Sequence, residues 1–126
     1  MSFWGIGPPL DLRACYKIFA SHSPAAHVDA MREQNNTARP GVAEAMLTAA
    51  GFVVDVRDRR TAVLEWPDAE IAWRAVSSVG PAVPALRQSD LTSLKRDILA
   101  ALEQCRDARG VYRFRNDQHF VVATKP

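Results

Sequence analysis

Three histidines are the side chains in this sequence best suited to acid and base chemistry. Imidazole titrates near neutral pH, so His22, His27 and His119 are candidate general bases or metal ligands. His22 and His27 are separated by five positions, which places them about 140° apart around a helix. No carboxylate stands at a metal-ligand spacing beside them. The pattern favours structural or solvent-facing roles, and it leaves His27 or His119 with a nearby carboxylate as an independent catalytic alternative.

The two cysteines, Cys15 and Cys105, lie far apart and lack the spacing of a disulfide framework or a zinc site. Both fall on apolar helical faces, where a thiol packs as a small and inert hydrophobic group. This usage indicates a reduced, cytoplasmic location. We expect no membrane partner, because no apolar run reaches the roughly 18 residues of a membrane span and the start of the chain lacks the order of a signal peptide.

Arginines mark two segments that read as strands: Arg57, Arg59, Arg60, Arg113 and Arg115. If segment 52–66 pairs antiparallel with segment 111–124, several guanidinium groups would converge and could bind a carboxylate or phosphate in bidentate fashion. Arg57 and Arg113 are then candidate anion contacts. The alternative is a solvated strand face, on which nearby aspartates neutralise the arginines.

The composition is that of an ordinary globular protein. The 126 residues suit a single domain, residues 1–126, with 48% hydrophobic and 24% charged residues. The net charge of +2 is too small for a dedicated nucleic-acid binder, so we expect no nucleic-acid partner.

Helical periodicity and capping signals predict about five helices. They cover 11–20, Ser23 to the polar run at 32–37, 40–51, 68–80 and 89–110, and Ser89 is the expected cap of the last one. Segment 52–66 reads as two strands, 52–57 and 61–66, with a turn or bulge between them. The end of the chain reads as strand 111–115, a turn at Asn116-Asp117 and strand 119–124.

These elements predict an α+β fold with a small, mostly antiparallel sheet. The segment FVVA, 120–123, is apolar at successive positions, which is typical of a central strand covered on both faces. The strands available to pair with it, including a short one at 2–4, leave one edge without a long partner. An open apolar edge is an association site, so a homodimer is one expectation.

Aromatic residues gather near the predicted junctions of loops and helices. Phe3, Trp4, Tyr16 and Phe19 stand early in the chain, and Trp66 and Trp73 flank Pro67-Asp68. Aromatic side chains in such places can line a pocket for a small molecule. Each of them also suits ordinary core packing.

The order of the elements resembles the C-terminal half of class I S-adenosylmethionine-dependent methyltransferases of the small-molecule, ubiquinone-biosynthesis-like type. SFWG resembles the end of the family's fifth strand, ARPGVAEAMLTAAGF (38–52) the helix entering the sixth, and QHFVVATKP (118–126) the seventh. The resemblance implies that 11–36 is a helical insert covering the substrate. It also implies a substrate pocket lined by Trp4, Tyr16, Trp66, Trp73 and Ser78.

The sequence departs from this family where the cofactor would bind. Such folds need a glycine-rich turn after an early strand, but Gly5 and Gly7 run into Pro8, Pro9 and Leu10. We therefore expect a truncated, substrate-side half that does not methylate by itself. S-adenosylmethionine would bind only if a separately encoded cofactor-binding half completed the fold. Two other hypotheses remain open, a relic of gene truncation and an autonomous dimeric module that binds a small molecule.

Overall fold

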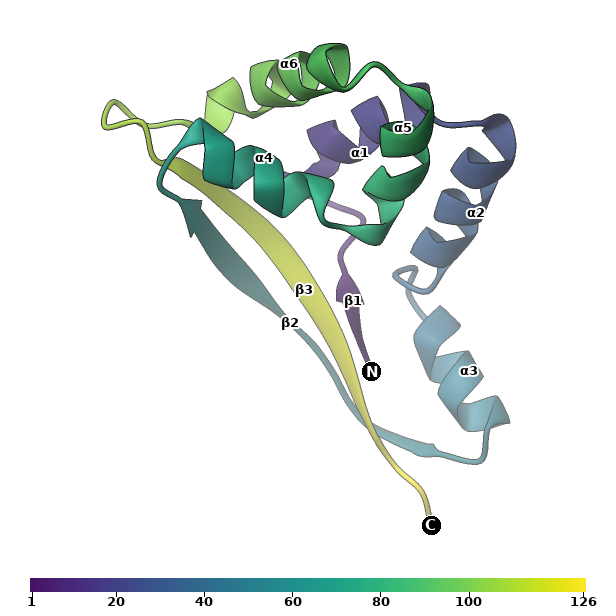
Figure 1. Cartoon of the computed structure of the whole chain (residues 1–126). Coiled ribbons are helices and arrows are strands. Elements are labelled where there is room, and N and C mark those ends of the chain that lie inside the picture. Colours follow the sequence, from purple (N-terminus) through teal and green to yellow (C-terminus); the bar gives the residue numbers. More distant parts are fainter.

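The computed structural model describes residues 1–126, except for the side chains of Met31, Gln34 and Asn35. It has the predicted α+β fold, with a three-stranded antiparallel sheet and six α-helices along the described chain (Figure 1). The strands are β1 (Ser2–Trp4), β2 (Val53–Trp66) and β3 (Tyr112–Thr124). The helices are α1 (Arg13–Ser21), α2 (Ala25–Asn36), α3 (Val42–Ala49), α4 (Ala69–Ser77), α5 (Val83–Gln88) and α6 (Leu91–Leu102).

The central strand of the sheet is β3, in the order β1-β3-β2. Strand β2 pairs with it antiparallel along nearly its whole length, from Val53 opposite Thr124 to Trp66 opposite Tyr112, with one register shift between Val54 and Val56. Both the central position of the last strand and the antiparallel pairing of 52–66 with 111–124 are therefore confirmed.

Two predicted interruptions of the strands are wrong. Strand β2 runs unbroken through 58–60, and β3 runs unbroken through Asn116 and Asp117. Hydrogen bonds of the polar side chains replace the expected turn: the Leu12 N–H donates to Asn116 Oδ1 at 3.2 Å, and Thr61 Oγ1 donates to Asp117 Oδ1 at 2.6 Å. Because these partners come from distant parts of the chain, local sequence preference for a turn is overridden.

The helix boundaries follow the side-chain caps. Asp68 caps α4 as predicted by accepting from the Ile71 N–H at 2.8 Å, whereas α6 is capped by Asp90 and not by Ser89. Helix α6 also ends earlier than predicted, at Leu102. Helix α5 is absent from the sequence-based prediction because Pro81 and Pro84 read as terminators, although a proline such as Pro84 is well tolerated in the first turn of a helix.

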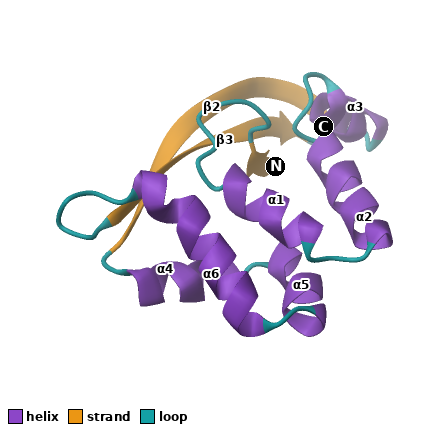
Figure 2. Cartoon of the chain, turned by 90° about the horizontal axis from the view of Figure 1, so that it is seen from above, coloured by secondary structure: helices purple, strands orange, loops and turns teal.

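The main core lies where β2 ends and β3 begins. Figure 1 shows α1, α4, α5 and α6 gathered at this end of the paired strands β2 and β3, and Figure 2 shows them on one side of the curved ribbon that these strands form. Side chains alternate between the two faces of a strand, so Leu64, Trp66, Tyr112 and Phe114 all face these helices. The largest fully buried members of the core include Phe19, Leu94, Ile98, Leu102 and Phe114.

The other end of the sheet is covered differently. Helix α3 contacts β2 and β3 there, and Ala43 and Val121 are buried. Val122 points to the opposite face, where 49% of its surface is exposed, and Val53 and Val56 are similarly exposed. The prediction that 120–123 is covered on both faces is therefore wrong, and this end of the sheet presents an uncovered apolar surface.

Candidate functional site

Three of the predicted pocket residues meet in one small cavity. Trp4 of β1, Tyr16 of α1 and Trp66 of β2 line a space of about 130 Å³, which we call the apolar cavity. Its other lining residues are Leu12, Cys15, Leu64, Ala75, Val76 and Val79. The lining is almost wholly apolar, so the cavity suits a small hydrophobic group and offers little to orient a polar one.

The pleat of the sheet places the two tryptophans in this cavity. Trp4 stands opposite Gln118 and Trp66 opposite Tyr112, and these positions of β3 share a face because they differ by an even number of residues. The Trp66 ring packs against Phe114, with 4.5 Å between ring centroids. Trp66 therefore also contributes to the core, as the packing alternative anticipated.

The structure does not place the other two predicted pocket residues in the lining. Trp73 packs against the main core from α4, and Ser78 is exposed and donates its hydroxyl hydrogen to the Arg74 carbonyl oxygen at 2.6 Å. The helical period explains the difference, because Ala75, Val76 and Val79 occupy the positions that face the cavity.

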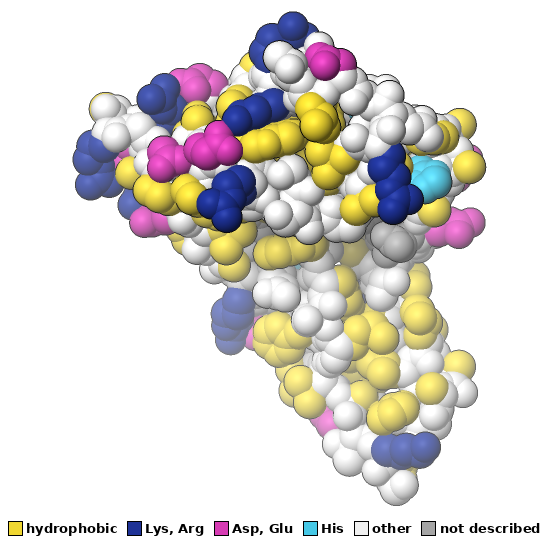
Figure 3. Space-filling model, viewed as in Figure 1, with side chains coloured by type: hydrophobic (Ala, Val, Ile, Leu, Met, Phe, Trp, Pro, Cys, Tyr) yellow, Lys and Arg dark blue, Asp and Glu magenta, His cyan; other side chains and the backbone are white. Residues whose placement is uncertain are grey.

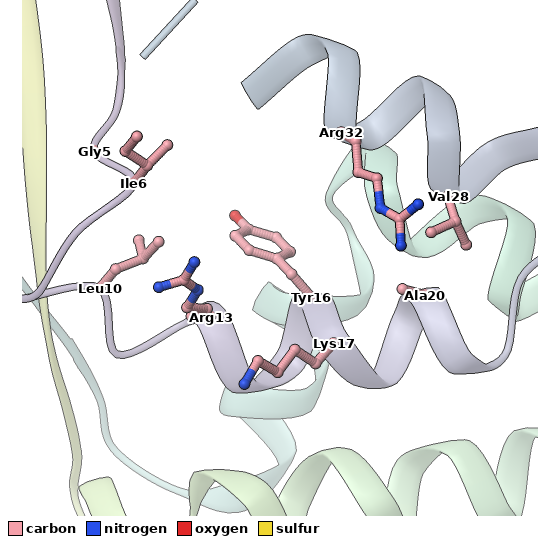
Figure 4. A pocket seen from close by; sticks show the side chains of 9 residues that line it. All are labelled: Gly5, Ile6, Leu10, Arg13, Tyr16, Lys17, Ala20, Val28 and Arg32. Atoms are coloured by element: carbon pink, nitrogen blue, oxygen red, sulfur yellow. The ribbon is translucent and has the colours of Figure 1, made fainter. Parts of the chain in front are cut away.

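A second, larger hollow lies on the other side of Tyr16. This space of about 330 Å³, which we call the basic cavity, lies between the loop after β1, helix α1 and helix α2 (Figure 4). Its lining residues are Gly5, Ile6, Leu10, Arg13, Tyr16, Lys17, Ala20, Val28 and Arg32. Among the described side chains, this lining has three cations and no carboxylate.

Tyr16 connects the two cavities, because it lines both of them. Its ring points from α1 into the basic cavity in Figure 4. Burial, with a smaller contribution from neighbouring Cys15, raises the pKa of the Tyr16 phenol above its usual value. The hydroxyl therefore keeps its proton at neutral pH and can donate a hydrogen bond to a ligand.

The two arginines predicted to contact an anion are not brought together. Arg57 lies opposite Val121, eight residues further along β3 than Arg113, a separation of about 26 Å along a strand. Each is paired with a carboxylate: Arg57 with Glu44 of α3, and Arg113 with Glu65 at 2.6 Å. Both arginines are therefore neutralised locally, but by glutamates and not by the aspartates that the alternative of a solvated strand face named.

The Arg57–Glu44 pair leads to a prediction about stability and pH. Arg57 Nη1 lies 2.5 Å and 2.6 Å from the two carboxylate oxygens, and this hydrogen bonding lowers the pKa of Glu44. The folded-state pKa then lies below the unfolded value of about 4.3, so the stabilisation is complete above that value and disappears as the pH falls through the folded pKa. We expect Glu44→Gln to lower the free energy of unfolding by about 1 kcal/mol at about pH 7.

Urea denaturation of both proteins at neutral and at strongly acidic pH tests this prediction. The difference in unfolding free energy between wild type and Glu44→Gln should vanish at a pH low enough to protonate the Glu44 carboxyl in both the folded and the unfolded state. Glu65→Gln is the matched control, because its pair with Arg113 is about half exposed and should contribute less. A difference that persists unchanged in acid would contradict the assigned cause.

His22 is the histidine that lies beside both a hydroxyl and a carboxylate. Its Nδ1 is 2.9 Å from Ser89 Oγ, and its Nε2 is 3.5 Å from Asp97 Oδ2. Serine, histidine and aspartate can form a nucleophilic triad, but 3.5 Å is too long for a well-formed hydrogen bond between the base and the group that would orient it. None of the three lines the apolar or the basic cavity. The contact is best explained as a link between the end of α1 and α6.

Among the described side chains, the other two histidines make no ion pair with a carboxylate, and Cys15 is shielded from solvent. His27 is exposed on α2, and the His119 ring packs 6.1 Å from the Phe3 ring, measured between centroids. Cys15 is fully buried, and this burial, which is the largest cause, raises the pKa of its thiol to about 12. Because the thiolate is the reactive form, Cys15 is inert at neutral pH.

No family model, curated protein or solved structure matches the chain. Its site is therefore interpreted from its own geometry. Among the described residues, no cluster of three or more histidine, cysteine or acidic side chains could hold a metal ion. Within the same part of the chain, every helix is too short or too polar to cross a membrane.

The glycines of the Gly-x-Gly turn do not form a cradle for a nucleotide cofactor. A Cβ atom on Gly5 would lie 2.9 Å from His119 Nε2, and the Gly5 N–H donates to the Asp117 carbonyl oxygen at 2.8 Å. Gly5 thus permits a close approach to β3, while Gly7 has no heavy atom within 4 Å of such a Cβ. These residues do not fit the S-adenosylmethionine site that the resemblance implies for a complete methyltransferase.

Sequence reasoning missed the cations of the basic cavity. The available signal was the spacing of Arg13, Tyr16 and Lys17, which places all three on neighbouring positions of one helical face. Like charges at positions i and i+4 repel each other and slightly destabilise a helix. The contribution of Arg32 depends on how α2 packs beside α1, which has no local signature in the sequence.

Proposed function

We propose that this chain is the substrate-side part of a methyltransferase-like fold, which holds a small molecule between its sheet and the helices α1 and α2. On this proposal, the chain does not transfer methyl groups by itself. The observation that carries it is the topology of the sheet: β1 and β2 are parallel to each other, and β3 lies antiparallel between them.

This topology is expected at the end of a doubly wound sheet. Parallel strands in one sheet need a long crossover connection, commonly helical, and the chain between β1 and β2 carries α1, α2 and α3. Doubly wound sheets are built from such crossover units, and otherwise parallel sheets of this kind can carry an antiparallel strand, most often at the edge. The strands and helices also come in the order that the resemblance assigns to the fifth, sixth and seventh strands of the family.

The uncovered surfaces of the sheet are places where a separate cofactor-binding half of the fold could associate. In the described chain, β1 is only three residues long and pairs on one side only, with β3. Trp4, Val53, Val56 and Val122 are exposed nearby. Figure 3 displays hydrophobic side chains gathered on the lower part of the molecule, over the ends of the strands and α3. Apolar patches of this kind mark association sites.

Calorimetric titration of the purified chain with S-adenosylmethionine and S-adenosylhomocysteine tests whether the chain alone can bind the methyl donor. We expect no saturable heat, because the turn at Gly5 and Gly7 packs against β3 or stands open. Saturable binding of either compound, or methyl transfer by the chain alone, would contradict the proposal.

The exposed sheet edge also favours a second candidate, an autonomous dimeric module that binds a small molecule. Sedimentation analysis separates the two functions. A monomer supports the substrate-side part, and a dimer that Val122→Lys dissociates supports the module. Val63→Lys is the matched control, because Val63 is similarly exposed, at 54%, but lies on the opposite face near the other end of β2.

A further inference from the structure

We propose that the basic cavity binds an amphipathic carboxylate, a small molecule with an apolar body and one carboxylate group. This inference rests on the proposed function in one respect, because it names the substrate class of that small-molecule site. It is carried by the charges and shape of the cavity between α1 and α2.

The charges at the cavity favour an anion. Arg13 and Lys17 approach from α1 and Arg32 from α2, and no acidic residue is found among the described residues of the lining. Among the ion pairs of the described side chains, Arg32 contacts Asp29 at 3.1 Å, whereas Arg13 and Lys17 take part in none. Carboxylates close to the cavity are Asp29, through this pair, Glu33, which lines an adjoining hollow with Arg13 and Arg32, and Asp11, which lines another with Leu10 and Arg13. The local balance is positive.

The geometry supplies cationic groups on two sides of the cavity. In Figure 4 the guanidinium groups of Arg13 and Arg32 lie on opposite sides of the Tyr16 ring. A guanidinium binds a carboxylate with two parallel N–H···O hydrogen bonds. The protonated Tyr16 hydroxyl can add a third donor. Arg13 and Lys17 also repel each other across one helical turn, and a bound anion relieves this repulsion.

The rest of the lining favours an apolar body. Ile6 and Leu10 on the loop after β1, Val28 on α2 and the Tyr16 ring provide the hydrophobic surface. The volume of about 330 Å³ lies at the lower end of the range for small-molecule pockets, about 300–1,000 Å³. A compound with one aromatic ring and a short acidic chain matches this size. A free inorganic anion would leave the apolar lining unused.

The experiment is a titration of the ¹⁵N-labelled full chain with 4-phenylbutyrate, followed by NMR. Its neutral amide, 4-phenylbutanamide, has the same apolar body without the charge. We expect saturable shifts for the amides of Arg13, Tyr16 and Val28 with the carboxylate and binding about tenfold weaker with the amide. Arg13→Gln and Arg32→Gln should each weaken carboxylate binding about fivefold or more. Arg74→Gln, on the exposed side of α4, is the control that should leave binding unchanged.

The spectra of the variants also report whether each one is folded, so a loss of binding is not mistaken for unfolding. Equal binding of the amide, unchanged affinity in both arginine variants, or shifts that map outside the cavity would overturn the inference. Inorganic phosphate is titrated as a further comparison. If phosphate binds saturably at the same residues and as tightly as 4-phenylbutyrate, the apolar body contributes nothing to binding, and the inference is overturned.

These outcomes are distinguishable from failure of the proposed function. Carboxylate binding at Arg13 and Arg32 together with saturable S-adenosylmethionine binding would leave the ligand class standing and reject the substrate-side role. Absence of binding of both compounds would reject the ligand class and leave the topology-based proposal in place.

Discussion

Replacement of Phe114 by alanine is expected to lower the free energy of unfolding by about 3–5 kcal/mol, a large part of the total for a domain of this size. Phe114 lies on the central strand with no exposed surface, and its ring contacts Trp66. It also stacks parallel to the Tyr112 ring at 6.4 Å between centroids. The helices around it pack against one another, so they cannot move freely to fill the cavity that removal of the ring would leave.

Urea denaturation followed by circular dichroism measures this effect. Phe114→Leu should cost less than Phe114→Ala, because leucine fills part of the same volume. Val63→Ala is the control on the neighbouring strand, since Val63 is 54% exposed on the opposite face, and it should change stability by less than about 0.5 kcal/mol. A small loss of unfolding free energy for Phe114→Ala would mean that this end of the paired strands β2 and β3 is not the centre of the core.

Replacement of Gly5 by valine is expected to lower the free energy of unfolding by about 1–3 kcal/mol through overpacking. The added Cβ would lie 2.9 Å from His119 Nε2 and 3.3 Å from the Asp117 carbonyl oxygen. The imidazole can move, but the backbone carbonyl cannot move without weakening the 2.8 Å hydrogen bond that it accepts from the Gly5 N–H. This bond continues the pairing of β1 with β3 at the wall of the basic cavity.

A double-mutant cycle with His119→Ala separates the two clashes. Removal of the imidazole should restore part of the stability lost in Gly5→Val, and the part that is not restored reports the backbone contact. Gly7→Val is the matched control, because nothing lies within 4 Å of its added Cβ. Equal losses at the two glycines would show that close approach to β3 is not the reason for glycine at position 5.

Five of the helices, α1, α2, α3, α4 and α6, could be predicted because their signals are local. The apolar stripe of α6 places Leu94, Ile98 and Leu102 on one face, and all three are fully buried. Asp68 caps α4 as expected. The exact end of α6 and the presence of α5 could not be predicted in the same way, because proline and polar residues are compatible with both a helix and its end.

The continuity of the two long strands was not predictable from local preferences. Asn116 and Asp117 favour a turn in an isolated peptide, yet both are buried within β3. Their partners, Leu12 and Thr61, are far away in the sequence. A buried polar side chain is tolerated when it is hydrogen-bonded, so the strand passes through positions that the sequence marks as breaks.

The candidate site, too, was predictable from the sequence only in part. Aromatic residues near the ends of elements indicated a pocket, and the structure does bring Trp4, Tyr16 and Trp66 to one cavity. Trp73 and Ser78 do not line it, because a shift of one or two positions around α4 decides which side chain faces the sheet. Arg57 and Arg113 were grouped because their two segments were supposed to pair antiparallel, but the register of that pairing places Arg57 opposite Val121 and Arg113 opposite Glu65, far apart along the ribbon.

Hydrophobic periodicity and capping, which act over a few residues, were enough to establish the α+β class and most helices, whereas the pairing of 52–66 with 111–124 was only a condition until the structure showed it. The basic cavity and the uncovered end of the sheet depend on contacts between elements that are distant in sequence. Arg13 and Arg32 become neighbours of one hollow only when α2 packs beside α1, and Val122 is left exposed only because α3 covers the other face. Such placements are decided by the packing of whole elements, since a side chain's own neighbours in the sequence carry no information about which helix will lie beside it.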